Sequence, residues 1–185
     1  MAKNKIAYYT QEGRIQSANI NFDNYSNTFT NLNTLTNVFE KDIAVAGIEG
    51  SKLLGLKIND FISNISGTIT TSGTVAGFYF TLKYVSTFSS NNILPENTIL
   101  RSIYFDGDSA IDALKSLVAD WDELVLAQID MKGNKYINLH PGSKLVISCD
   151  VVTLNTLVTA TNYILGKIND SDPRSIKIIS YLEDY

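Results

Sequence analysis

The alternation of apolar and polar residues over residues 75–88 constrains the fold of this chain more than any other feature. One face of the segment carries Ala76, Phe78, Phe80, Leu82 and Tyr84, and the other carries Gly77, Tyr79, Thr81 and Lys83. A period of two residues is the geometry of a β-strand with one buried face. Such a strand needs partners, so the segment predicts a sheet.

Similar patterns recur along most of the chain. They predict strands at residues 54–62, 65–70, 99–105, 124–130, 135–139, 145–151 and 176–182, with less regular patterns at 5–9 and 14–20. Thr71-Ser72-Gly73 predicts a hairpin between the strands at 65–70 and 75–88, and residues 131–134 predict a second hairpin. His140-Pro141-Gly142 predicts a turn.

One amphipathic helix is predicted at about residues 109–119. Its apolar stripe consists of Ile111, Leu114, Leu117, Val118 and Trp121, at spacings of three and four. Asp108 or Ser109 can cap the helix, and Ser109 with Asp112 fits a capping box. A single helix among many short strands favours a mainly β fold, a β-sandwich or barrel-like domain decorated by the helix.

The chain has 185 residues and a mass of 20.4 kDa, which fits a single domain spanning residues 1–185. At this size about 70% of the unfolded surface is buried on folding, so neither a disulfide nor a metal ion is needed for a stable core. Cys149 is the only cysteine, which excludes an intrachain disulfide.

The sequence does not decide the structure of two segments. Residues 17–37 hold 13 Asn, Ser or Thr among 21, yet aromatic and leucine residues recur through residue 39 at nearly helical spacing. An extended polar and aromatic arm at 17–39 that contacts a neighbouring molecule accounts for both facts, and so does a long loop folded over the protein's own core. Residues 153–168 fit a helix and a strand equally well.

The charge and hydropathy patterns exclude two kinds of partner. The net charge is −4 without a run of Lys or Arg, so we expect no nucleic-acid partner. No apolar stretch reaches 18 residues, so we expect no membrane span. Residues 6–12 are too short and polar for the apolar core of a signal peptide, so we expect synthesis and folding in a cytoplasm.

No set of residues predicts catalysis, a cofactor or a metal site. His140 and Cys149 could form a nucleophilic pair, but Cys149 lies on the core face of a predicted strand, where an inert thiol is usual. Residues 106–112 resemble a calcium loop without its glycine and its final Glu, and helix capping explains their acids more simply. Asp120, Asp122, Glu123 and Asp130 are better explained as solvated charges than as a glycosidase pair. We therefore expect a protein that is not an enzyme.

The surface composition favours contacts with other proteins. The chain has 10 Tyr, and only 18% of its residues are charged. Tyrosine is enriched, and charge depleted, in the centres of protein interfaces.

In overall character the chain resembles virion structural proteins of tailed bacteriophages. The resemblance rests on a β-fold rich in Asn, Thr and Ile, on the short helix at 109–119 and on the segment at 17–39, and the AT-rich codon bias is similar to that of crAss-like phages. It implies a multicopy virion protein, made in the host cytoplasm, whose partner is the major capsid protein or another virion subunit. An auxiliary or decoration protein of the capsid shell is the first expectation.

Two alternatives remain. One is a subunit of a tail tube or head–tail connector ring, and the other is a carbohydrate-binding, adhesin-like β-sandwich. Under the virion hypothesis the expected assembly contacts are Tyr8, Tyr9, Phe22, Tyr25, Phe29 and Leu32.

Overall fold

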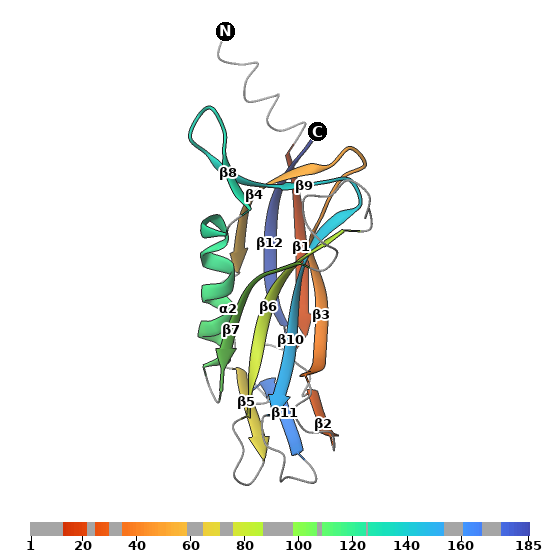
Figure 1. The fold of residues 1–185 in the computed structure, drawn as a ribbon, viewed down its shortest axis with the longest axis vertical. Coiled ribbons are helices and arrows are strands. Elements are labelled where there is room, and N and C mark those ends of the chain that lie inside the picture. The colour runs from red at the N-terminus through yellow and green to blue at the C-terminus, as the bar shows by residue number, and fades with distance from the viewer. Residues whose placement is uncertain are drawn as a thin grey trace.

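The computed structural model describes residues 13–21, 25–29, 35–58, 65–70, 76–86, 98–106, 109–124, 126–153, 161–167 and 175–185. In this part of the chain the fold is mainly β: two antiparallel sheets pack as a sandwich, with one short helix (Figure 1). The elements in chain order are β1 Gly13–Asn21, β2 Tyr25–Phe29, β3 Leu35–Val45, β4 Ser51–Ile58, β5 Ile65–Thr70, β6 Ala76–Ser86, β7 Thr98–Phe105, α2 Ala110–Ala119, the 3-10 turn η1 Trp121–Glu123, β8 Ala127–Ile129, β9 Lys135–Leu139, β10 Ser143–Thr153, β11 Thr161–Lys167 and β12 Ser175–Asp184.

The two sheets of the sandwich contain five and four strands. Sheet A has the order β1-β12-β4-β9-β8, and sheet C has the order β3-β10-β6-β7. A smaller sheet B, of order β2-β11-β5, lies at the lower end of the molecule in Figure 1. The turns between β3 and β4 and between β8 and β9 lie at the opposite end, which we call the upper end.

The core between the sheets follows the predicted alternation. Phe78, Phe80, Leu82 and Tyr84 of β6 are fully buried, and Leu145, Ile147, Cys149 and Val151 of β10 lie beside them in register. Phe80 stacks on Phe105 with 4.5 Å between ring centroids, and Phe105 also stacks on Phe78. These rings form the apolar centre of the sandwich.

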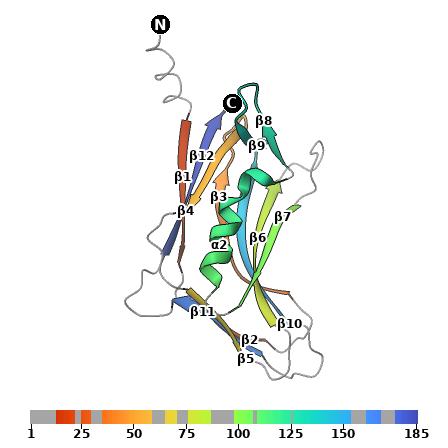
Figure 2. The same ribbon diagram turned by 90° about the vertical axis from the view of Figure 1, so that its left-hand side faces the viewer.

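Helix α2 closes one side of the sandwich. Figure 2 shows it lying lengthwise between β4 and β7, and its residues contact both strands. Ala113, Leu114, Leu117 and Val118 are buried, whereas Ile111 and Trp121 of the predicted stripe are only partly buried. The predicted capping box is wrong, because the Ser109 hydroxyl donates to the Asp106 carbonyl oxygen and makes no capping bond.

Several strand predictions are confirmed and one pairing is wrong. The hairpin of β8 and β9 forms as predicted, and Gly133 supplies the positive φ of its turn. The predicted hairpin of residues 65–70 and 75–88 does not form: β5 pairs with β11, and β6 pairs with β10 and β7. The strand expected at 54–62 begins earlier, at Ser51, and its residues 59–62 lie outside the described part.

The two open segments are strands wherever the structure describes them. Residues 17–21 end β1, 25–29 form β2 and 35–39 begin β3, and these strands belong to three different sheets. The described residues of the 17–39 segment are therefore strands whose backbone is paired within the molecule. Residues 161–167 form β11, so the strand alternative is correct there.

Candidate assembly surfaces

The side of the sandwich opposite α2 is bounded by two edge strands, β1 of sheet A and β3 of sheet C. Near the upper end the two sheets are joined by side chains. The Gln16 amide donates to the Val45 carbonyl oxygen at 3.3 Å and accepts from the Val45 N–H at 2.8 Å. The Ser180 hydroxyl of β12 donates to the buried Ile43 carbonyl oxygen. These bonds satisfy backbone groups at the edge of β3 that would otherwise lack a partner.

Arg14 is the centre of this connection. Its guanidinium donates to both carboxylate oxygens of Asp184, at 2.9 and 2.7 Å, and also to the Val45 carbonyl oxygen and the Ser51 hydroxyl. The Arg14 hydrogen bonds lower the pKa of the Asp184 carboxyl. The cluster holds together β1, β3, β4 and β12.

This cluster predicts a pH-dependent stability. Because the pKa of Asp184 is lowered by folding, its carboxylate stabilises the native state above pH about 4, the ordinary value for Asp. That contribution is lost as the pH falls through the lowered value. We expect Asp184→Asn to be less stable than the wild type at pH 7, with a difference that shrinks towards pH 2. Urea unfolding across this range measures it, and Glu49→Gln in the exposed β3–β4 turn is the control. A difference that is independent of pH would contradict the assignment.

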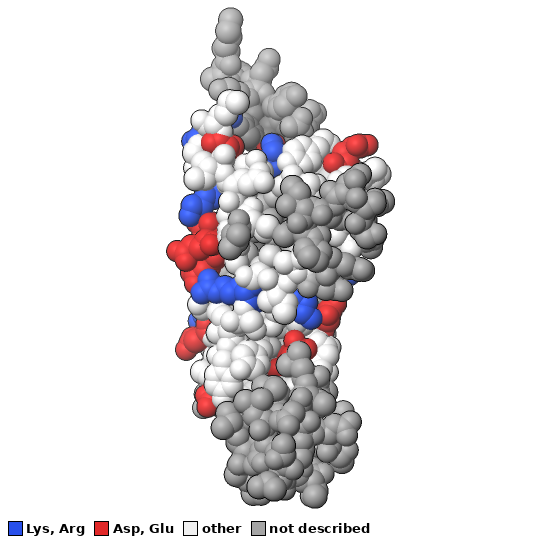
Figure 3. Space-filling model, viewed as in Figure 1, with Lys and Arg blue, Asp and Glu red and all other residues white. Residues whose placement is uncertain are grey.

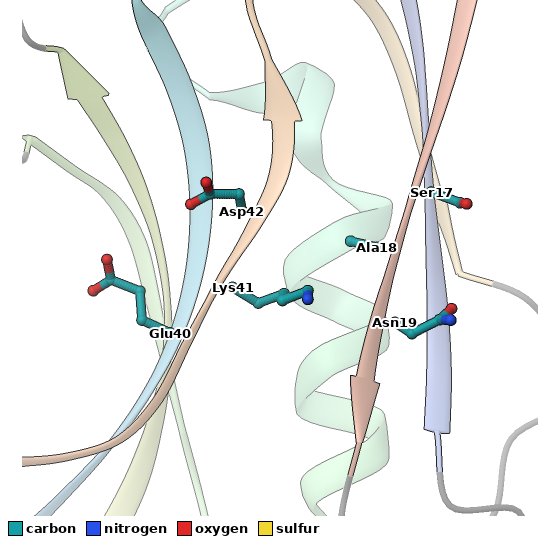
Figure 4. Close-up of a pocket in the computed structure, with 6 residues that line it drawn as sticks. All are labelled: Ser17, Ala18, Asn19, Glu40, Lys41 and Asp42. Atoms are coloured by element: carbon teal, nitrogen blue, oxygen red, sulfur yellow. The ribbon is translucent and has the colours of Figure 1, made fainter.

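Below the Arg14 cluster the two edge strands separate, leaving a groove of about 580 Å³. Its lining residues are Ser17, Ala18 and Asn19 of β1 and Glu40, Lys41 and Asp42 of β3. Figure 4 shows that the Lys41 side chain extends from β3 into the gap. Phe39 and Ile43, its neighbours on the same face of β3, are buried. A lysine pointing inward on an edge strand opposes the addition of further strands to β3.

The two acidic residues of the groove form ion pairs on the outer face of sheet C. Glu40 pairs with Lys83 at 3.5 Å and Asp42 pairs with Lys144 at 2.8 Å. Figure 3 shows the side of the molecule that faces the viewer in Figure 1, where acidic and basic side chains lie next to one another around a mostly uncharged middle. Such exposed pairs contribute little to stability.

An exposed apolar patch lies on the outer face of sheet A. Ile15 lies opposite Tyr181, which in turn lies opposite Gly55 of β4, and Leu54 is the next residue along. Ile15 is 68% exposed, Leu54 40% and Tyr181 39%. The Tyr181 ring lies against Gly55, where an added Cβ would be 3.3 Å from it. We call Ile15, Leu54 and Tyr181 the sheet A patch.

The upper end presents further exposed apolar side chains. Ile48 of the β3–β4 turn is 92% exposed, Met131 at the tip of the β8–β9 hairpin is fully exposed, and Ile129 and Tyr185 are more than half exposed. Exposed apolar groups rimmed by polar residues are typical of interaction sites. The upper end and the sheet A patch are therefore the candidate contact surfaces of the described residues.

The predicted assembly residues are not tested by this structure. Tyr8, Tyr9, Phe22 and Leu32 lie outside the described residues. Tyr25 and Phe29 are the end residues of β2, and only their backbone pairing with β11 is described. The sheet A patch was not predicted, although Ile15 and Tyr181 were both placed in predicted strands. The pairing of Ile15 with Tyr181 could not be predicted from the sequence, because the two residues lie 166 positions apart.

The residues considered for catalysis occupy ordinary structural positions. Cys149 is fully buried, and burial raises the pKa of its thiol well above the ordinary value. His140 lies in the turn before β10, roughly 20 Å along the strand from Cys149. The described residues therefore do not bring the two together.

Three of the four candidate acids have side-chain partners that explain them. Asp120 pairs with Arg101 and Asp122 with Lys135, while Asp130 accepts hydrogen bonds from Asn134. The Asn134 bonds lower the pKa of Asp130. Of the calcium-like segment, residues 107 and 108 lie outside the described part. Within the described part, no three His, Cys, Asp or Glu side chains are grouped as a metal site would require. Among the described residues, no helix is long and apolar enough to cross a membrane.

No family model matches the chain, and no curated protein matches it in sequence. Distant structural matches are found among solved structures of infectious bursal disease virus. The Gx strain structure matches with 12% identity over 91% of this chain and a TM-score of 0.31. The VP2 subviral particle matches with 9% identity over 94% of this chain and a TM-score of 0.28. The chain spans 37% and 38% of the length of those chains.

Proposed function

We propose that this chain is a non-enzymatic structural protein of a virus particle, present in many copies. Within that class we propose an auxiliary protein bound to the capsid shell of a tailed phage, whose partner is the major capsid protein. The observation that carries the multicopy structural role is the sheet A patch, because it exposes three large apolar side chains on three adjacent strands. The tailed-phage assignment is supported by the resemblance in composition and element pattern described above.

The exposed apolar side chains of the sheet A patch add nothing to the stability of an isolated copy, but they can stabilise a contact with another protein. Burying exposed apolar surface in a contact contributes roughly 25 cal/mol per Å² of area removed from water. The rim of the patch is polar, with Ser17, Lys57 and the Lys52–Glu183 ion pair around it. An apolar centre with a polar rim is the usual anatomy of a protein interface.

A double substitution in the patch tests this function. We expect the wild-type protein to bind the virus particles of its source at a fixed copy number. Leu54→Ser with Tyr181→Ser should reduce the bound copies at least about tenfold, a loss of 1.4 kcal/mol or more in binding. Both side chains are substantially exposed, so the variant should remain folded. Quantitative mass spectrometry of particles washed after incubation measures the bound copies.

Lys177→Ser is the matched control, because Lys177 lies on the same face of β12 outside the patch. Binding of the wild type to no particle, combined with binding to a glycan array, would replace this function with the carbohydrate-binding alternative. Assembly of the protein alone into rings or tubes would favour the tail or connector alternative.

A further inference from the structure

Sheets A and C have four edge strands, and three of them carry features that oppose pairing with another chain. β8 has only three residues. β7 lies against α2 and has an irregular register at Leu100. β3 has register shifts at Val38 and Ile43 and carries the consecutive charges Glu40, Lys41 and Asp42. Short length, bulges, charges and a covering helix are the devices by which proteins protect sheet edges.

The fourth edge strand, β1, carries none of these features. Its nine residues pair with β12 without any register shift, and residues 15–21 have no charged side chain. Arg14, the one charged residue of the strand, is held by Asp184. Among the described residues β1 pairs with β12 alone. In an antiparallel strand every second residue directs its N–H and C=O away from that partner, so β1 offers a row of backbone groups for a further strand.

The space beside β1 is open. The groove runs along residues 17–19, and Figure 4 shows the gap between this part of β1 and β3. Ala18 points towards the gap, whereas Ser17 and Asn19 point away from it, as expected of alternate residues in a strand. The side chains of β1 therefore point into the groove or away from it, and the backbone edge lies between these two directions, where no described strand other than β12 pairs with β1.

We propose that two copies of this chain pair through β1, antiparallel, across a two-fold axis that passes through Ser17. A nine-residue strand overlaps its own copy completely only when its central residue lies on the axis. In this register Ile15 faces Asn19 of the other copy and Arg14 faces Ile20. No two like charges are opposed, so the strand is electrostatically compatible with itself.

The pairing deepens the proposed multicopy role, on which it rests, by naming a second copy as one partner. It joins two five-stranded sheets into one sheet of ten strands. Ile15 lies on β1 itself, so the two sheet A patches come to lie on the same continuous face. A dimer with a doubled patch binds a particle surface with two contacts in place of one, which raises its apparent affinity.

Cysteine cross-linking tests the register. In the paired copies, the two residues at position 17 lie directly opposite, with Cβ atoms about 5 Å apart. Ser17→Cys should therefore give a cross-linked dimer with a short bis-maleimide. The control Asn21→Cys places its two thiols roughly 27 Å apart and should not be cross-linked by the same reagent. Cys149 is fully buried and should not react. Equal cross-linking of both variants, or of neither, would overturn the proposal.

A charge exchange gives a second readout that does not depend on thiol chemistry. Native mass spectrometry should show wild-type dimers, and Ser17→Lys and Ser17→Asp should each dissociate about fivefold more readily. A mixture of the two variants should recover a mixed dimer, while Gln128→Lys on the opposite edge strand should leave the dimer unchanged. A wild type that is monomeric at all concentrations would overturn the pairing even if it binds particles, whereas a dimer that binds no particle would overturn only the proposed function.

Discussion

Replacing Phe80 by alanine should lower the free energy of unfolding by about 3–5 kcal/mol. Phe80 is fully buried, stacks on Phe105 and contacts Phe39 of β3 at 6.2 Å between centroids, so its removal leaves a cavity between β3, β6 and β7. The free energy lost with the buried apolar surface and the cost of the cavity add to one another. Chemical unfolding monitored by circular dichroism measures the change.

Lys83→Ala in the same strand is the control for this substitution. Lys83 faces outward and pairs with Glu40, an exposed interaction that contributes about 1 kcal/mol or less. A similar loss for both variants would show that β6 tolerates no substitution, and a loss of about 1 kcal/mol for Phe80→Ala would show that the aromatic stack is not the centre of the core.

Gly67→Val should destabilise the protein by about 1–3 kcal/mol, or by more if sheet B is forced away from the sandwich. A Cβ at Gly67 would lie 2.7 Å from the Phe78 ring and 3.1 Å from the Phe105 ring. Both rings are buried and stacked, so neither can move aside without disturbing the core. Thermal unfolding measures the loss.

Gly55→Val is the matched control, because it also adds a side chain to a strand glycine beside an aromatic ring. There the neighbour is Tyr181, which is 39% exposed and free to turn outward, so the cost should be smaller. Equal costs at the two glycines would mean that sheet B does not lie against the aromatic core.

The parts of the fold that could be predicted from sequence are those encoded within one element. The alternation in residues 75–88 predicts the buried face of β6 correctly, and the spacing of Leu114, Leu117 and Val118 predicts the buried face of α2. The β8–β9 hairpin was predictable because its two strands adjoin the glycine turn that joins them. In each case the information lies within a few residues.

The failures concern partners that are distant in sequence. Only five residues separate β5 from β6, yet the partner of β5 is β11, more than 90 residues later. No local signal in the sequence favours β11 over β6. The composition of residues 17–39 left an arm and a long loop open, whereas pairing with β12, β11 and β10 makes its described residues strands, although Asn is a poor strand former. The candidate surfaces were missed for the same reason, since Arg14 meets Asp184 across 170 positions.

The place of β12 within sheet A has a consequence for biosynthesis. β12 lies between β1 and β4, so β1 has no partner in the sheet until residues 175–184 have been made. During translation the unprotected strand therefore leaves the ribosome first and finds its own partner last. Throughout that interval it can pair with other nascent chains, and chains synthesised close together on one message are the nearest available partners.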